Sequence, residues 1–329
     1  MMLSQSASTK IPVLSQIYSP KLTNFISATI MPRHHDLQNH HIISKLRIAY
    51  QGVPGAYGEA AALKAYPNCE TLQCQHFQDA IQAVERGWAE EAVIPIENSI
   101  VGSVHTNYDL LLRHTLHVVG ETHLFVDHCL LALPAAAKHH LTSVFSHPQA
   151  LLQCQMSLNM LGVAAIPTHN TGVAAQIVAS RGVQENGAIA SARAAQLYGL
   201  NILDHKFQDR SNNITRFLKL AREPLLPATN TRSKTSISFI PDELHKALSV
   251  FAQTGIHISK IESRPLQKLP PNAVNGFKHG SNMNFKYVYF IDFEASVIEP
   301  RAQYALERLQ KLAIYVRVLG CYPMSAATW

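Results

Sequence analysis

The feature that most constrains this chain is a pattern that recurs between residues 46 and 221, in which a short apolar run is followed by a polar loop and then by a segment with helical spacing. The first copy has a predicted strand over Leu46–Tyr50, a loop with three glycines over 51–58 and a helix over 59–66. Chains that alternate strands and helices fold into α/β domains, whose ligands bind at loops that follow strand ends. We therefore expect functional side chains in these loops.

The same analysis predicts the other elements of this region. Strands are expected over 92–96, 116–126, 129–133, 143–145, 163–166, 187–190, 201–203 and 214–221. Helices are expected over 77–86, 107–114, 171–181 and 192–197, with a further helix that opens at Ser146–Gln149 and runs to Leu161. The strands over 116–126 and 129–133 would carry the chain into a second lobe, and the chain would return before 214–221. The pattern thus predicts two α/β lobes with a cleft between them.

A second domain follows a proline-containing linker over 223–233. Its predicted order is a strand over 235–240, a helix to Thr254, strands over 256–263 and 285–293, a helix over 301–313 and a strand over 315–319. A loop rich in Pro, Asn and Gly over 266–284 separates the two middle strands. This β-α-β-β-α-β order is ferredoxin-like.

Composition limits the function classes. The formal charge is +6 and the pI is near 9.0, but the basic residues are scattered, so we expect no nucleic acid as partner and an acidic small molecule instead. No apolar run reaches the roughly 18 residues of a membrane span. The five cysteines lack C-x-x-C spacing, which argues against a disulfide framework or a zinc site. The histidine group His34, His35, His40 and His41 lies in a segment that we do not expect to fold, so no metal is predicted.

Residues 1–45 are rich in Ser and Thr and contain several basic residues but only one acidic residue, Asp36. This composition is typical of an organelle transit peptide. The alternative is an ordinary flexible N-terminus.

Two loops carry candidate chemistry. In the strand over 214–221, Thr215 and Arg216 are adjacent at the point where an Asn-rich loop enters the strand. Both residues have a purely structural interpretation too, because Thr is common in strands and Arg can protect a sheet edge. The loop over 51–58 could hold a carboxylate with its backbone N–H groups, or it could be only a tight turn.

The segment Asn213–Phe217 resembles the Thr-Arg-Phe signature of prephenate dehydratases and plant arogenate dehydratases. Further stretches agree with this family in the same order: Tyr50–Tyr57, Pro95–Ser99, Phe145–Leu151, Ala188–Ser191 and Glu262–Pro265. The resemblance implies a two-lobed, periplasmic-binding-protein-like catalytic domain over 46–222, a linker over 223–233 and a ferredoxin-like (βαββαβ) ACT domain over 234–323. Residues 1–45 would be a plastid transit peptide and 324–329 a tail.

The resemblance also implies a function. The chain would convert arogenate to L-phenylalanine by decarboxylating dehydration in the chloroplast stroma, with prephenate as a second substrate and without cofactor or metal. Thr215 would donate a hydrogen bond to the departing hydroxyl and Arg216 would grip a carboxylate. Implied substrate-binding residues are Gly55, Ala56, Asn98, Ser99, Ser103, Ser146, Thr171, Ser191 and Phe217. The alternative is a catalytically weak or inactive regulatory paralogue that binds an amino acid.

In the ACT domain the resemblance implies an L-phenylalanine site with Glu262, Ser263, Arg264 and Pro265, and a homodimer or tetramer. This chain departs from the family pattern at Gly58, Thr106, Asn170, Arg210 and Asn212, and these departures are the basis of the alternative of an inactive paralogue. The expected ligand-binding loop after Ile240 is also missing, and only Pro241, Asp242 and Glu243 remain. We therefore predict that feedback by phenylalanine is weak or absent.

Overall fold

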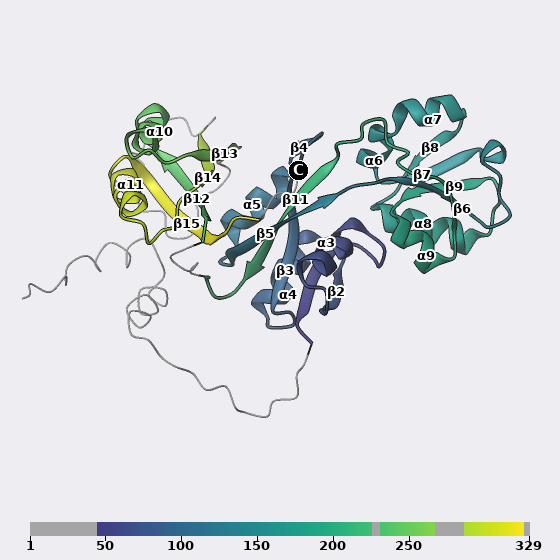
Figure 1. The fold of residues 1–329 in the computed structure, drawn as a ribbon, viewed down its shortest axis with the longest axis horizontal. Helices are drawn as coiled ribbons and strands as arrows, with labels where there is room; N and C mark the ends of the chain where they lie inside the picture. Colours follow the sequence, from purple (N-terminus) through teal and green to yellow (C-terminus); the bar gives the residue numbers. More distant parts are fainter. Residues whose placement is uncertain (1–44, 226–230, 267–285, 326–329) are drawn as a thin grey trace, which may run out of the picture. The chain divides into compact units, whose positions relative to one another are not determined.

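The computed structural model describes residues 45–225, 231–266 and 286–325. Contacts divide the chain into two compact units, one over 45–223 and one over 224–324. The larger unit contains two sheets and the smaller unit one, as labelled in Figure 1. The predicted transit segment and most of the predicted loop over 266–284 lie outside the described residues.

The first lobe of the larger unit is a mixed sheet in the order β2-β1-β3-β11-β5, and β4 adds to β3. Its strands are β1 (Arg47–Gln51), β2 (Glu70–Cys74), β3 (Glu91–Asn98), β4 (Gly102–Ser103), β5 (His117–Phe125) and β11 (Ile214–Ala221), and its helices are α3 (Tyr57–Ala65), α4 (Phe77–Glu85) and α5 (His105–Arg113). The sequence did not predict β2, because this edge strand has no buried residue and so lacks an apolar run.

The second lobe has a sheet in the order β10-β6-β9-β7-β8. Its strands are β6 (Cys129–Ala132), β7 (Ser143–Ser146), β8 (Ala164–Pro167), β9 (Asn186–Ala190) and β10 (Asn201–Asp204), and its helices are α6 (Pro148–Gln153), α7 (Gln155–Leu161), α8 (Thr171–Arg181) and α9 (Ala192–Tyr198).

The single helix expected from Ser146–Gln149 to Leu161 is wrong, because the helix breaks at Cys154. The carboxylate of Asp209, far along the chain, accepts hydrogen bonds from the backbone N–H groups of Met156 and Ser157. These bonds satisfy first-turn donors and allow a new helix, α7, to begin there. A long-range partner thus sets this boundary.

The chain crosses between the lobes twice, at 126–128 and at 205–213, and the two crossing segments are hydrogen-bonded to each other. The N–H of Val126 donates to the carbonyl of Asn213 (2.8 Å), and the N–H of Phe207 donates to the carbonyl of His128 (2.7 Å). The two-lobed architecture expected from the sequence is therefore confirmed, and a paired hinge joins the lobes.

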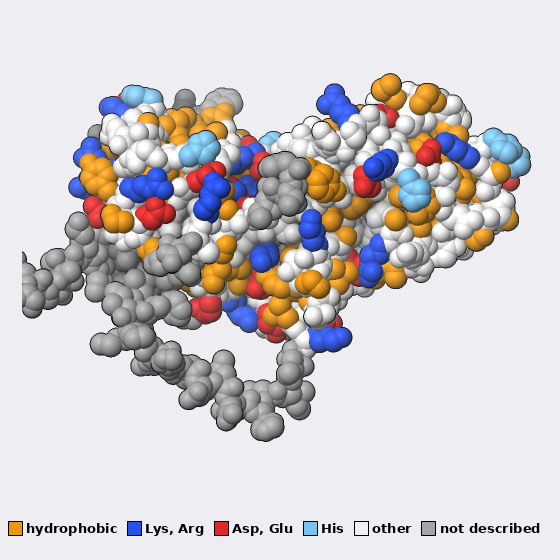
Figure 2. All heavy atoms as spheres, viewed as in Figure 1, with side chains coloured by type: hydrophobic (Ala, Val, Ile, Leu, Met, Phe, Trp, Pro, Cys, Tyr) orange, Lys and Arg blue, Asp and Glu red, His pale blue; other side chains and the backbone are white. Residues whose placement is uncertain are grey.

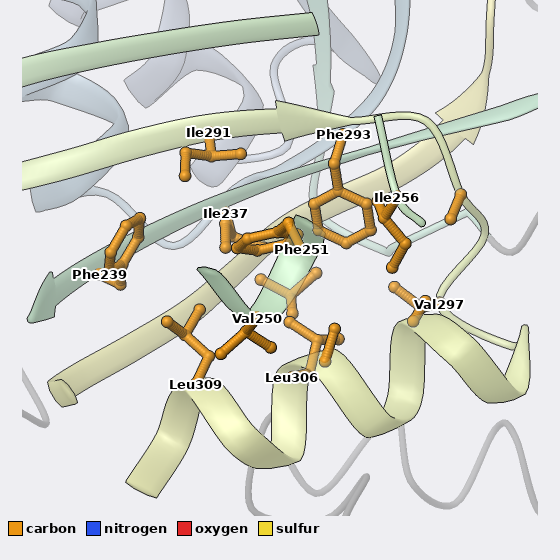
Figure 3. Packing of buried hydrophobic residues seen from close by; sticks show 14 of the residues in the cluster. Ile237, Phe239, Val250, Phe251, Ile256, Ile291, Phe293, Val297, Leu306 and Leu309 are labelled. Carbon is orange, nitrogen blue, oxygen red and sulfur yellow. The ribbon is translucent and has the colours of Figure 1, made fainter. Parts of the chain in front are cut away.

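The smaller unit is a sheet in the order β13-β14-β12-β15 with two helices. Its elements are β12 (Ser233–Pro241), α10 (Leu244–Gln253), β13 (Ile258–Pro265), β14 (Tyr287–Phe293), α11 (Pro300–Lys311) and β15 (Ala313–Pro323), in the expected βαββαβ order. Both helices cover one face of the sheet, where Phe239, Phe251 and Phe293 pack with Val250 and Leu306 (Figure 3).

None of the helices that the structure describes between residues 45 and 325 has both the length and the hydropathy of a membrane-spanning helix. No cluster of three or more His, Cys, Asp or Glu side chains in this part of the chain could hold a metal ion, and the histidines at 34–41 lie outside it. All five cysteines are described, and all are free thiols. Figure 2 shows basic and acidic side chains interspersed over the face in view, without a continuous basic patch.

Candidate active site

A cavity of about 510 Å³ lies at the cleft between the two lobes of the larger unit. Its first-lobe wall comes from the β1–α3 loop, the β3–β4 turn and the start of β11, and its second-lobe wall comes from the N-terminal ends of α6 and α8. Six of the predicted site residues line it: Ala56, Asn98, Ser103, Thr171, Thr215 and Phe217. Four apolar residues, Phe77, Val93, Pro95 and Phe217, form a wall suited to a hydrocarbon ring.

Thr215 and Asn98 form a hydrogen-bonded polar pair in the cleft. They stand directly opposite each other on β11 and β3, so their side chains meet on the same face of the sheet. The Asn98 Nδ2 group donates to Thr215 Oγ1 (2.9 Å). Its Oδ1 accepts from the backbone N–H groups of Ile100 and Val101 (3.0 and 3.1 Å), so the NH2 end of the amide is the end that faces Thr215. With a donor already on Oγ1, Thr215 can direct its own hydroxyl proton towards a ligand.

The lining residues that the structure describes include no Lys, Arg, Asp or Glu. Cationic side chains of the lining therefore do not bind the acidic small molecule that the positive net charge led us to expect. Two helices of nine and eleven residues, α3 and α8, instead begin at the cleft wall. Backbone N–H groups at helix N-termini favour anions, so these ends can bind carboxylates.

Two histidines of the cleft have perturbed pKa values. Burial lowers the pKa of His128 and also that of His147, because a buried imidazolium loses its hydration. His128 lies at the first crossing, and its side chain is hydrogen-bonded on both ring nitrogens. His147 is the N-cap of α6, where its Nδ1 accepts from the N–H of Gln149 (3.2 Å). Both rings are expected to be neutral near pH 7.

The structure contradicts the predicted orientation of Arg216. Its side chain lies on the opposite face of β11 from Thr215 and is absent from the cleft lining. The guanidinium is buried and forms ion pairs with Glu121 (Nε to Oε2, 2.7 Å) and Glu97 (Nη1 to Oε1, 2.9 Å). Alternation along a strand puts neighbouring residues on opposite faces, so only one of the two can face the cleft. Arg216 therefore joins β3, β11 and β5 rather than gripping a ligand.

Gly55 and Ser191 lie outside the cavity lining, although both were predicted to bind substrate. The Ser191 hydroxyl donates to the carbonyl of Gly55 (2.7 Å) and accepts from the N–H of Ala194 (3.1 Å), and it caps α9. The buried Glu59 carboxylate accepts from the Gly55 N–H and from Arg193 Nε (both 2.8 Å). These contacts join the β1–α3 loop of the first lobe to α9 of the second lobe.

We predict that Gly55→Ala destabilises the larger unit by about 2–5 kcal/mol. Gly55 has φ +87°, where a Cβ costs about 1–2 kcal/mol, and the new methyl would lie 2.9 Å from the Ala194 Cα, an overpacking cost of about 1–3 kcal/mol. Urea unfolding measures the total. Gly87→Ala is the matched control, since Gly87 has φ +76° but nothing lies within 4 Å of the position that its new Cβ would occupy. If both variants lost the same free energy of unfolding, the result would contradict a tight contact between Gly55 of the first lobe and Ala194 of the second.

Ser146 and Ser99 were also predicted to bind substrate, but neither lines the cavity, and both form hydrogen bonds within the protein. Ser146 is fully buried at the end of β7 and donates to the carbonyl of Ile189 (2.6 Å), and it is not the N-cap of α6. Ser99 Oγ donates to the carbonyl of Asn212 and accepts from the N–H of Ile214 (both 2.9 Å). Both hydroxyls hold neighbouring segments together.

Of the departures from the family pattern, two line the cleft. Gly58 lies in the first turn of α3, where a Cβ would come within 2.7 Å of the Gln51 carbonyl oxygen. Asn170 is the N-cap of α8 and accepts from the N–H of Val173 (2.9 Å), so the cap is intact. Thr106, Arg210 and Asn212 are exposed and lie outside the lining.

In the smaller unit, the residues predicted to sense phenylalanine lie on edge strand β13. Ser263 and Pro265 are exposed, whereas Glu262 and Arg264 are half-buried. A cavity of about 380 Å³ occurs elsewhere in this unit, lined by residues that include Pro241, Asp242 and Tyr287. None of the four predicted residues lines it.

The sequence analysis assigned no role to Tyr57, His128, Gln153 or Asn213. Three of them line the cleft, and Asn213 accepts a hydrogen bond from the lining residue Asn98. Tyr57 and Asn213 stand inside stretches that carry the family resemblance, which is the one signal that could have marked them. His128 and Gln153 carry no such signal.

Comparison with known proteins identifies the family. A family model described as prephenate dehydratase matches residues 48–225. The chain is 55% identical over 285 residues to "Arogenate dehydratase/prephenate dehydratase 1, chloroplastic" of Arabidopsis thaliana, covering 85% of this chain and 73% of that protein. It is 52% identical over 286 residues to "Arogenate dehydratase 1" of Petunia hybrida, covering 85% of this chain and 68% of that protein.

Two solved structures share the fold. A protein described as GqqA, a novel type of quorum quenching acylase, has a TM-score of 0.72 and 34% identity, covering 85% of this chain and 98% of its own. The prephenate dehydratase of Arthrobacter aurescens, solved in complex with L-Phe, has a TM-score of 0.74 at 24% identity, covering 84% and 90%. The family model spans more than half of the chain and the sequence matches to the curated relatives extend over most of it, so the chain belongs to the prephenate dehydratase family.

Proposed function

We propose that this protein is an arogenate dehydratase that also accepts prephenate, and that it makes L-phenylalanine or phenylpyruvate. The observation that carries the proposal is the Thr215–Asn98 pair, which faces the cleft beside an apolar wall in a chain of this family. The curated relatives at 50–55% identity are named for one or both of these activities.

The reaction removes CO2 and water from a cyclohexadiene. The bond from the ring to its carboxylate breaks, its electron pair becomes part of the aromatic ring, and the C–O bond to the ring hydroxyl breaks with uptake of one proton to release water. Aromatisation drives this step, so the protein has to hold the carboxylates and supply a hydrogen-bond donor to the leaving oxygen.

Thr215 is the proposed donor. A threonine hydroxyl is a weak acid, and the Asn98 N–H on its oxygen stabilises the negative charge that develops there as the proton moves towards the leaving group. The proton lost from Thr215 is replaced from solvent after the products leave. Phe217 and Pro95 pack against the ring, and the N-terminal ends of α3 and α8 hold the carboxylates.

The relative described as an acylase does not alter this proposal. A hydroxyl that attacks an acyl group needs a base to take its proton. The hydrogen-bond partner of Thr215 Oγ1 is the Asn98 amide nitrogen, which is a donor and cannot act as a base. The arrangement favours a hydroxyl that donates.

Separate turnover assays on arogenate and prephenate test the function. Protein starting near Lys45 is expected to release L-phenylalanine from arogenate and, at a lower kcat/KM, phenylpyruvate from prephenate. Binding of either acid without aromatic product would instead support the regulatory paralogue.

The remaining assignments belong to the same proposal. We assign residues 46–222 to catalysis, 223–233 to the linker and 234–323 to an ACT domain that pairs two or four copies. Relatives named chloroplastic support a plastid location, with residues 1–45 as the transit segment. The structure of a relative with bound L-Phe supports L-phenylalanine as the effector to be tested.

We predict weak feedback inhibition by L-phenylalanine. In the smaller unit only Asp242 and Glu243 separate β12 from α10, so the turn is too short for the ligand-binding loop that the family resemblance implies. Turnover of the preferred substrate is expected to fall by less than half at 1 mM L-phenylalanine. Strong inhibition at micromolar concentrations would contradict this prediction and would point to the β13 residues or to the cavity beside Pro241.

A further inference from the structure

Asn213 stands at the centre of a run of side-chain hydrogen bonds that leads from the cleft into the hinge. Asn98 Nδ2, which donates to Thr215, also donates to Asn213 Oδ1 (2.7 Å). Asn213 Nδ2 donates to Gln153 Oε1 (3.0 Å), and His128 Nε2 lies 2.9 Å from the same oxygen. The run therefore joins β3 of the first lobe, both crossing segments and α6 of the second lobe.

The direction of every bond in this run is fixed from one end. Because two backbone N–H groups occupy Asn98 Oδ1, its amide nitrogen must face Thr215 and Asn213. Asn213 must then present its oxygen to Asn98 and its NH2 group to Gln153. Gln153 Oε1 accepts this bond, so His128 must carry its proton on Nε2. A reversed Asn213 amide would place two NH2 groups against each other.

The other end of the run is consistent with this direction. A neutral His128 with its proton on Nε2 leaves Nδ1 as an acceptor, and the Tyr57 hydroxyl lies 3.0 Å from it. Burial lowers the pKa of His128, which favours this neutral ring. Tyr57 Oη is also 2.8 Å from the carbonyl oxygen of Asp127, which can share the hydroxyl proton.

Asn213 itself is 1% exposed and is not part of the cavity lining, so it cannot act by touching a substrate. Its backbone is held as well, since its carbonyl accepts from Val126 (2.8 Å) at the neighbouring crossing. Its amide can therefore locate the Asn98 NH2 group, which has two hydrogens and two acceptors: Asn213 Oδ1 and Thr215 Oγ1.

We propose that Asn213 is a positioning residue of the dehydration step: its amide holds the Asn98 NH2 group against Thr215 Oγ1 and so turns the Thr215 proton into the cleft. Its second bond, to Gln153, ties this arrangement to the position of the second lobe. This inference rests on the proposed function, because it concerns the donor of the same reaction.

The test is a double-mutant cycle on kcat with Asn213→Ala and Thr215→Ala. Asn213→Ala is expected to lower kcat by about 10- to 100-fold and to change KM by less than about threefold, because it acts on the donor and not on substrate binding. In the Thr215→Ala background the same substitution is expected to change the rate by less than about twofold. Single-turnover reactions with enzyme in excess keep the slow rates measurable.

Two further variants separate positioning from packing. Asn213→Asp keeps the side-chain volume and the oxygen that faces Asn98. Burial at this 1% exposed position favours the protonated carboxyl, whose O–H can donate to Gln153 Oε1, so the variant is expected to lose less activity than Asn213→Ala. Asn201→Ala controls for the loss of one side-chain hydrogen bond away from the cleft. Asn201 donates to the Pro134 carbonyl (3.2 Å) at an exposed site, and the variant is expected to retain kcat.

Three results would each overturn the inference. The first is an equal loss of kcat from Asn213→Ala in the wild-type and Thr215→Ala backgrounds, and the second is an effect of Asn213→Ala on KM alone. The third is an Asn213→Asp variant whose kcat is as low as that of Asn213→Ala. A wild-type protein that turns over neither acid would instead overturn the proposed function. The two failures are therefore distinguishable in one set of assays.

Discussion

Replacing Thr215 by alanine is expected to lower kcat on the preferred substrate by about 10²–10⁴-fold with a small change in KM. The substitution removes the hydroxyl that faces the cleft and accepts the Asn98 N–H at 2.9 Å, so the leaving oxygen loses its only side-chain donor in the proposed mechanism. Steady-state kinetics on arogenate and prephenate measure both parameters.

Thr215→Ser is the matched control for this prediction, because it keeps the hydroxyl and removes one methyl group. It is expected to retain kcat within about tenfold, because the donating hydroxyl remains. The remaining loss arises because a serine can rotate away from the Asn98 amide more easily than a β-branched threonine. The unfolding midpoint in urea is expected to stay close to that of the wild type in both variants, because Thr215 is only half-buried. An alanine variant that keeps more than half of the wild-type kcat would remove Thr215 from the mechanism.

The sequence predicted the parts of the site that depend on local pattern. The end of β3 and the start of β11 follow from short apolar runs that meet polar loops, and Asn98 and Thr215 stand at these junctions. Strand pairing then places the two residues opposite each other, and both line the cleft. The dehydration chemistry was predicted from the family resemblance, because the periodicity of apolar residues indicates strands and helices but not a reaction.

The sequence could not predict which hydroxyls face the cleft. Ser99 and Ser191 follow strand ends and Ser146 is the last residue of its strand, yet each is hydrogen-bonded to backbone from a distant segment. Gly55 likewise packs against Ala194, a contact between residues far apart in the chain. These partners exist only once the lobes are folded, so local pattern does not reveal them.

The orientation of Arg216 shows the same limit at a single position. Alternation places Arg216 and Thr215 on opposite faces of β11, but it does not say which face meets the cleft. The answer depends on carboxylates from two other strands, Glu97 on β3 and Glu121 on β5. Their side chains are 26% and 2% exposed, so they compensate a guanidinium that would be costly to bury alone.

Arg216→Ala is accordingly expected to destabilise the larger unit by about 3–5 kcal/mol, because it leaves the Glu121 carboxylate buried without its guanidinium. Urea unfolding followed by tryptophan fluorescence or circular dichroism measures the loss. The double variant Arg216→Met with Glu121→Gln removes the cation and the buried anion together, so it is expected to recover part of the stability. If Arg216→Ala instead raised KM strongly and left the free energy of unfolding unchanged, the result would contradict this structural role. Arg216 would then be a residue that binds a substrate carboxylate. The two outcomes differ because a buried ion pair acts on the folded state, whereas a ligand contact acts only when substrate is bound.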